Sequence, residues 1–278
     1  MLSIVILFFY TYIKVYTESI KKYSQAILSS LVIFALLSFY LYLRRGYFDL
    51  FIANKVFAAT SLIILAVVLL IGNLGRLYDL FDPLLIYRKH LGIVSFFAAF
   101  VHGVLSLFFL SSRFSIDYYL YNLPTFILGL VGLVILGYLF LISFKKIIQK
   151  MNPKVWWLHQ VWGARIAGGL VFLHLILMKY PGWIRWYQIG GSDDLVRPYL
   201  PPASILAAAF GLFVILARVV EIANRNLAKR IIPIIFVALI LFIGLSFTVG
   251  MIKSPMALRA IPSVVLVSMD DQLQGLTE

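Results

Sequence analysis

Long apolar stretches, separated by short polar and basic connections, follow one another along almost the whole chain. Most of these stretches approach the length of about 20 residues that an α-helix needs to cross a bilayer. We therefore predict an all-α fold, a polytopic membrane helical bundle of about eight spans. The predicted spans cover residues 1–16, 25–43, 53–71, 88–110, 123–144, 154–178, 204–220 and 231–251.

Composition supports this interpretation and excludes several others. Hydrophobic residues make up 63% of the 278, well above the share in soluble domains. The net charge of +13 does not indicate nucleic-acid binding, because the basic residues lie in the connections between spans. The chain has no cysteine, which excludes disulfides, thiol catalysis, thiolate-ligated haem and cysteine-bound iron–sulfur clusters.

The basic residues also predict an orientation. The face that holds the loops after the first, third, fifth and seventh spans carries the larger share of Lys and Arg, which places this face in the cytoplasm. With eight spans, both termini then lie outside. Residues 1–16 lack a basic leader and a small-residue cleavage site, so we expect a retained span. The expected location is a prokaryotic cytoplasmic membrane, as a multi-pass protein.

All four histidines lie on two of the predicted spans, the fourth and the sixth, which enter the membrane from the same face. His90 and His159 begin these spans. His102 and His174 follow 12 and 15 residues later, about 18 Å and 22 Å along a helix axis. Histidine inside a bilayer is costly, and two helices with histidines at two matched levels suit two stacked haems with an imidazole on either side of each iron.

Helical rotation ranks the two pairs. Fifteen residues leave His174 about 60° from His159, whereas twelve leave His90 about 120° from His102. We therefore predict His102 and His174 as the firmer haem ligands and His90 with His159 as the weaker pair. The alternative for His90 is an interfacial residue. A zinc or copper site is the competing hypothesis, but neither span contains a carboxylate to complete it.

Three basic residues are candidate partners of haem propionates. Arg88 and Lys89 precede His90, where they also suit ordinary interface anchors. Arg165 lies six residues beyond His159, a depth at which a guanidinium needs a polar or anionic partner. Glycines on the two spans either admit a flat macrocycle or allow close helix packing; they are Gly92, Gly103, Gly163, Gly168 and Gly169.

The order Arg-Lys-His90-Leu-Gly, nine residues, His102, and then Trp-Leu-His159 with Leu-His174-Leu, resembles the ferric reductase-like transmembrane superfamily. This superfamily includes the membrane cores of ferric reductases and NADPH oxidases and the haem subunit of the bacterial methionine-sulfoxide reductase system. The resemblance covers residues 25–222 as a six-helix haem-binding core. Residues 1–24 and 223–252 are then additional spans, and residues 253–278 are a tail.

The resemblance implies that His102, His159 and His174 are haem ligands, with His90 near the usual fourth site. The spacing from His159 to His174 is longer than the family's, which a bulge near Gly168-Gly169 would absorb. The flavin and nicotinamide domains of ferric reductases are missing, and no glycine-rich dinucleotide fingerprint appears. Any flavin therefore lies on a partner.

We predict a membrane b-type cytochrome with one or two haems b, a transmembrane oxidoreductase subunit. It passes electrons from a cytoplasmic reductase or membrane quinol to an extracytoplasmic acceptor, with ferric iron, dioxygen and a periplasmic redox partner left open. The connection over residues 180–202 is the expected docking surface, with Trp183, Trp186, Tyr187 and Asp193-Asp194. The alternative is a haem-free membrane transporter or assembly factor on the same scaffold.

Overall fold

The computed structural model describes the backbone of residues 2–190 and 195–259, and the side chains of residues 20–190 and 195–253. Its elements are, in chain order, α1 (Leu2–Arg45), α2 (Leu50–Leu77), the 3-10 helix η1 (Asp79–Tyr87), α3 (Arg88–Val104), the π-helical turn η2 (Leu105–Phe109), α4 (Ile116–Tyr121), α5 (Leu123–Leu141), α6 (Lys145–Ile148), α7 (Pro153–Ile189), α8 (Ala203–Ala223) and α9 (Arg225–Arg259).

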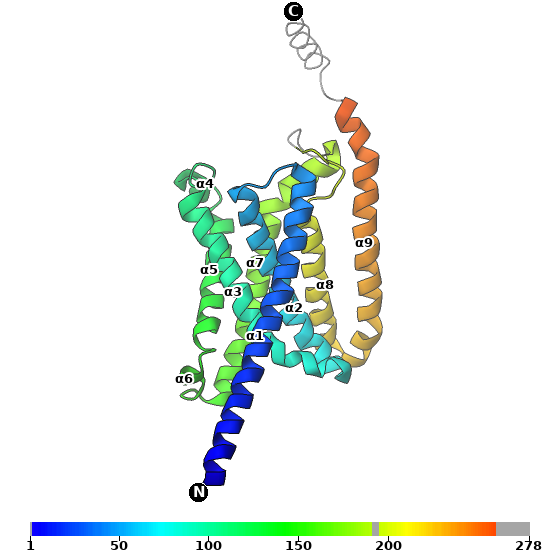
Figure 1. The fold of residues 1–278 in the computed structure, drawn as a ribbon. Coiled ribbons are helices and arrows are strands. Elements are labelled where there is room, and N and C mark those ends of the chain that lie inside the picture. The colour runs from blue at the N-terminus through cyan, green and yellow to red at the C-terminus, as the bar shows by residue number, and fades with distance from the viewer. Residues whose placement is uncertain (1, 191–194, 260–278) are drawn as a thin grey trace, which may run out of the picture.

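The long helices stand side by side in an upright bundle, and the short elements lie at its two ends (Figure 1). Within the described residues, seven helical runs are long and apolar enough to cross a membrane. They are Ile20–Arg45, Leu50–Leu77, Asp79–Phe109, Leu123–Leu141, Pro153–Ile189, Ala203–Ala223 and Arg225–Lys253. The predicted all-α, multi-pass membrane bundle is confirmed.

The N-terminal part of the bundle differs from the sequence prediction. Two spans with a turn between residues 16 and 25 were predicted, but the backbone runs through this stretch as the single helix α1. The reason is that no glycine or proline occurs before Gly46. The polar residues between the two apolar segments include Glu18, Lys21 and Lys22, which favour a helix rather than a break. The side chains of residues 1–19, and with them most of the predicted first span, lie outside the described residues.

Because α1 is one helix where two spans were predicted, its N-terminal end lies at the opposite end of the bundle from the one predicted. The N-terminal end of α1 lies at the end of the bundle that also holds η1, α6 and the α8–α9 connection (Figure 1). The far end of α9 lies at the opposite end of the bundle. Both termini were expected on one face, but the start of α1 and the last described residues of α9 lie at opposite ends of the bundle. We call the end with α6 the basic face and the other end the outer face.

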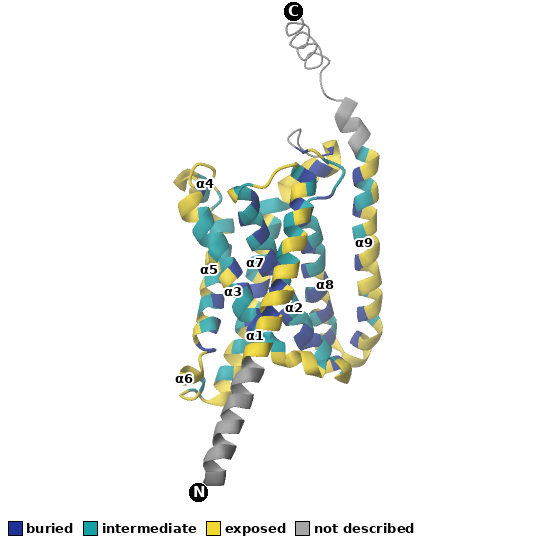
Figure 2. Cartoon of the chain, viewed as in Figure 1, coloured by how far each residue is buried: buried dark blue, intermediate teal, exposed yellow. Residues whose placement is uncertain are grey.

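Helix α2 is the centre of the bundle. Sixty-one per cent of its most apolar stretch is buried inside the protein, more than for any other described span (Figure 2). Its polar residues Asn54, Thr60, Ser61 and Asn73 are buried as well. Ser61 exchanges hydrogen bonds with Ser95 of α3: each hydroxyl donates to the other residue's carbonyl oxygen at 2.9 Å. These bonds fix the rotation of α3 against α2 and so set the direction in which the α3 side chains point.

Helix α7 is longer than predicted. It continues past residue 178 to Ile189 and ends at Gly190, whose φ of 77° is the left-handed conformation that terminates helices. Trp186 is buried and its Nε1 donates to the Pro198 carbonyl oxygen at 3.1 Å, while Trp183 Nε1 donates to Ser204 Oγ at 2.9 Å. The first part of the predicted docking connection is thus helical and tied to the start of α8. Asp193-Asp194 lie outside the described residues.

Candidate functional site

His102 on α3 points toward the central helix. Its Nδ1 lies 2.8 Å from Oδ1 of Asn54 on α2, and Asn54 is only 2% exposed. The amide nitrogen of Asn54 donates in turn to Ser106 Oγ at 2.9 Å, which orients the amide with its oxygen toward the imidazole. An amide oxygen only accepts, so Nδ1 of His102 carries the ring proton and Nε2 keeps a free lone pair.

His174 on α7 has a similar arrangement with α5. Its Nδ1 lies 2.7 Å from the carbonyl oxygen of Thr125, so this Nδ1 also carries the proton. The ring lies against the α5 backbone at Gly129, where an added Cβ would stand 2.9 Å from both Cε1 and Nδ1 of the imidazole. Gly129 is therefore needed for the position of His174. A glycine inside the apolar span 123–144 was the only signal in the sequence.

His102 and His174 lie at the same end of the bundle, because their partners Asn54 and Thr125 stand near the starts of α2 and α5. His102 and His174 lie within electrostatic range of each other at one level of the bundle, on α3 and α7. We call these two residues the outer pair. Each offers a neutral imidazole whose Nε2 is free to donate its lone pair. Haem iron binds such a nitrogen on either face of the macrocycle. Within the described residues no group of three or more His, Cys, Asp or Glu side chains gathers, as a closed zinc site would need.

Two lysines that the sequence interpretation passed over lie at the same level. Lys55 follows Asn54 on α2, and its Nζ lies 3.9 Å from the centre of the Phe51 ring. Lys179, five residues beyond His174 on α7, lies within electrostatic range of both histidines and of Lys55. The other charged groups that act on Lys55 are also cations: Arg44, Arg45 and Arg113. The charged groups that act on Lys55 are thus all cationic, and a lysine inside an apolar span was the signal for them in the sequence.

His90 and His159 are not brought together. His90 is 8% exposed, its Nδ1 lies 3.1 Å from the Ile86 carbonyl oxygen, and its ring makes an edge contact with Tyr23 of α1 at 4.3 Å between centroids. His159 is exposed and hydrogen-bonds to the hydroxyl of Tyr138 on α5. One ring therefore faces α1 and the other faces α5. Ligation by these two residues stays a prediction without geometric support.

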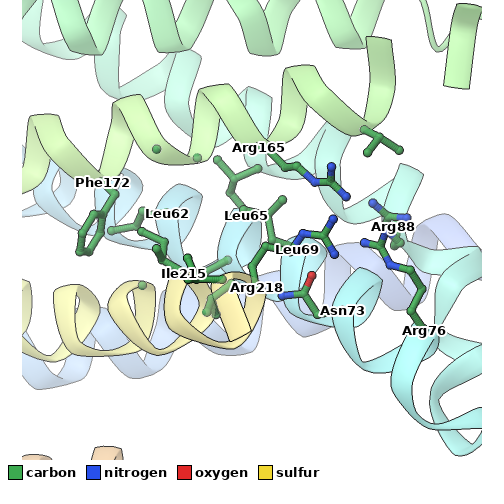
Figure 3. Close-up of a pocket in the computed structure, with 17 residues that line it drawn as sticks. Leu62, Leu65, Leu69, Asn73, Arg76, Arg88, Arg165, Phe172, Ile215 and Arg218 are labelled. Atoms are coloured by element: carbon green, nitrogen blue, oxygen red, sulfur yellow. The ribbon is translucent and has the colours of Figure 1, made fainter. Parts of the chain in front are cut away.

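Arg88 and Arg165 do meet, in a cavity of about 230 Å³ between α2, α7 and α8 (Figure 3). Arg76 and Arg218 complete its polar end, and no histidine lines it. Two of the three predicted propionate partners thus line one cavity, which is separate from the histidines. Lys89 is exposed and does not line the cavity.

The glycines mostly serve helix packing. An added Cβ would lie 2.7 Å from Leu139 at Gly163 and 2.8 Å from Leu69 at Gly168, whereas Gly92 and Gly169 have open space beside them. The predicted bulge near Gly168-Gly169 is absent, because α7 runs through this stretch as a regular helix. The irregular turn lies instead on α3, where η2 follows His102 and presents Ser106 to Asn54.

Part of the chain matches a known protein family. A family model described as "Ferric reductase like transmembrane component" matches residues 56–164, less than half of the chain. The matched segment includes His90, His102 and His159 and stops before His174. The resemblance seen in the sequence is confirmed over these residues, and the match indicates a component of transmembrane electron transfer. No curated protein matches the chain.

Proposed function

We propose that this membrane protein, whose residues 56–164 form a ferric reductase-like transmembrane component, is a b-type cytochrome that holds one haem at the outer pair. The observation that carries the proposal is that both imidazoles of the outer pair are held through Nδ1 and lie within electrostatic range of each other. Each Nδ1 hydrogen is held by an oxygen acceptor, so both free Nε2 atoms belong to rings of fixed orientation. Histidines that bind iron or other metals donate their second ring nitrogen in this way.

The surrounding residues fit this group in charge as well as in ligand type. When bound, haem supplies one-electron redox chemistry between the ferrous and ferric states. The chain's own part is to hold the rings through Asn54 and Thr125 and to exclude water with the apolar side chains of the bundle. Lys55 and Lys179 are then the partners for the propionates, a role that the sequence had suggested for Arg88, Lys89 and Arg165.

The position of the outer pair suggests the route of the electrons. Because His102 and His174 lie toward the outer face, the acceptor is an extracytoplasmic one, such as ferric iron, dioxygen or a redox partner protein. The donor is a separate cytoplasmic reductase, with any flavin on that partner, or a membrane quinol. The larger number of basic residues on the opposite face supports a cytoplasmic position for it.

The test is the haem content of the purified protein. We expect about one haem per chain and a reduced-minus-oxidised spectrum of a low-spin, bis-histidine b cytochrome. A haem-free preparation from haem-replete cells would contradict the proposal and favour a membrane transporter or assembly factor that uses the same scaffold. A high-spin spectrum would leave haem binding in place but contradict ligation by both members of the outer pair.

A further inference from the structure

The cavity between α2, α7 and α8 has a polar end and an apolar end (Figure 3). Arg165 and Phe172 lie at its two ends along α7, seven residues or about 10 Å apart. Arg218 and Gly211 mark the same length on the antiparallel helix α8. The polar end is the one nearer the basic face, and the apolar end reaches toward the middle of the bundle between Leu62, Phe172 and Ile215.

The charge at the polar end is not balanced. Four guanidinium groups gather there, from Arg76, Arg88, Arg165 and Arg218, and the carboxylate of Glu221 is the one acidic group that acts on Arg165 beside them. Glu221 is already engaged: its Oε1 lies 3.2 Å from Arg76 Nε, and its Oε2 pairs with Arg218. Within the described residues, no salt bridge is formed by Arg88 or Arg165, so an excess of positive charge remains.

The same end has hydrogen-bond donors without acceptors. In the described part of the chain, five buried side-chain polar atoms lack a partner. Three of them belong to cavity-lining residues: Asn73 Nδ2, Arg88 Nε and Arg218 Nε. Asn73 is 3% exposed. A buried donor left unpaired is unfavourable, more so for a charged group, so these atoms point to an acceptor that the protein itself does not provide.

The cavity is also reachable from the lipid. Two of its lining residues, Gly169 on α7 and Val219 on α8, are exposed, and no atom lies within 4 Å of a Cβ built on Gly169. A ligand can therefore enter sideways between α7 and α8. Its charged part would lie at the depth of the basic face, and its apolar part would run along the bundle into the hydrocarbon layer.

We propose that this cavity binds a phosphate-bearing amphiphile, an anionic phospholipid of the leaflet at the basic face. Phosphate oxygens accept from guanidinium groups and from the Asn73 amide, and the proximal acyl chain covers the apolar floor. No histidine lines the cavity, so this site is separate from the haem site and does not depend on it.

The experiment compares short-chain lipids on the purified full-length protein in detergent. Dioctanoyl-phosphatidylglycerol, dioctanoyl-phosphatidylcholine and inorganic phosphate are titrated, with binding measured by native mass spectrometry and by the shift of the thermal unfolding midpoint. The Arg165 guanidinium lies 5.0 Å from the Trp162 ring, so tryptophan fluorescence gives a third signal. The variants are Arg165→Gln and Asn73→Leu. The matched control is Lys154→Gln, an exposed cation on the same helix outside the cavity.

We expect phosphatidylglycerol to bind at least about tenfold more tightly than phosphatidylcholine. Arg165→Gln and Asn73→Leu should each weaken it about tenfold, whereas Lys154→Gln should leave it unchanged. Equal binding of the two lipids, or no loss in either cavity variant, would overturn the proposal. If inorganic phosphate binds as tightly as the lipid, the anion site stands but the amphiphile is wrong. Loss of haem in Arg165→Gln, with lipid binding intact, would show that this arginine contributes to haem binding and not to lipid binding.

Discussion

The two levels of histidines lie on the same helices, in the same order and at similar spacing, yet only one level forms a pair. At the outer level, His102 is held by Asn54 of α2 and His174 by Thr125 of α5, and the two lie within electrostatic range of each other. At the basic face, His90 turns to α1 and His159 turns to α5. The two levels differ in the residues that hydrogen-bond to the imidazole rings. Asn54 of α2 and Thr125 of α5 accept from the outer rings. His159 also bonds to α5, at Tyr138, so it is His90, with its Ile86 bond and its Tyr23 contact on α1, that departs from the outer arrangement.

Helix geometry accounts for part of this difference. Twelve residues rotate a side chain by about 120° relative to the starting position, so α3 cannot present His90 and His102 on one face. The bonds between Ser61 and Ser95 set the rotation of α3, and they place the His102 face toward Asn54. Spacing along a helix therefore fixes the depth of a ligand, but its direction depends on the neighbouring helices.

Loss of haem is the largest effect by which variants at the two histidine levels should differ. His102→Ala or His174→Ala should remove nearly all haem, because each deletes an axial ligand. His90→Ala and His159→Ala should keep about one haem per chain. The pyridine haemochrome content of matched preparations measures this. Equal loss in all four variants would mean that both levels ligate, and the comparison drawn above would be wrong.

Removing the acceptor behind His102 should have the next largest effect. Asn54→Leu leaves the ring without its hydrogen-bond partner, and we expect haem affinity to fall about 10- to 100-fold. Asn73→Leu, on the same helix but far from the histidines along it, is the control and should not change haem affinity. Haem transfer to apomyoglobin gives the dissociation rates. Similar rates in the two variants would show that the contact does not orient the ligand.

A smaller effect is expected from Gly129→Ala. The new Cβ would stand 2.9 Å from the His174 ring, so the ring or α5 must shift. We expect partial haem occupancy and an altered low-spin electron paramagnetic resonance signal. Gly92→Ala on α3, where an added Cβ meets nothing within 4 Å, should behave like the unchanged protein. Full occupancy with an unchanged signal in Gly129→Ala would contradict the position assigned to His174.

The smallest effect concerns the redox potential. A positive charge near haem stabilises the reduced state, so Lys55→Gln should lower the midpoint potential by on the order of tens of millivolts. Lys154→Gln, at the basic face, should leave it unchanged. Potentiometric titration followed by absorbance measures both. A rise, or no change, in Lys55→Gln would place this lysine away from the haem.

Much of this architecture follows from the sequence, because apolar length and the basic connections predict the spans and their sides. Depth and rotation predict His102 and His174 as the firmer ligands, and this stays a prediction. The continuous helix α1 was not predicted. The polar stretch between its two apolar segments lowers the hydropathy as a turn would, but it contains no glycine or proline and stays helical. Lys55 and Gly129 were passed over for a different reason: each is a single residue in an apolar span, and its role depends on what faces it from another helix.

The π-helical turn η2 has a consequence for changes in chain length. A widened turn accommodates one extra residue, so α3 beyond His102 is already out of step with the segment before it. An insertion or deletion within residues 107–109 would leave the bond from Asn54 to Ser106 in place and alter only the part that leads to the outer face. The same change between His90 and His102 would turn the ligand by about 100° and detach it from Asn54. The register of the chain is therefore strict from His90 to Ser106 and tolerant beyond it.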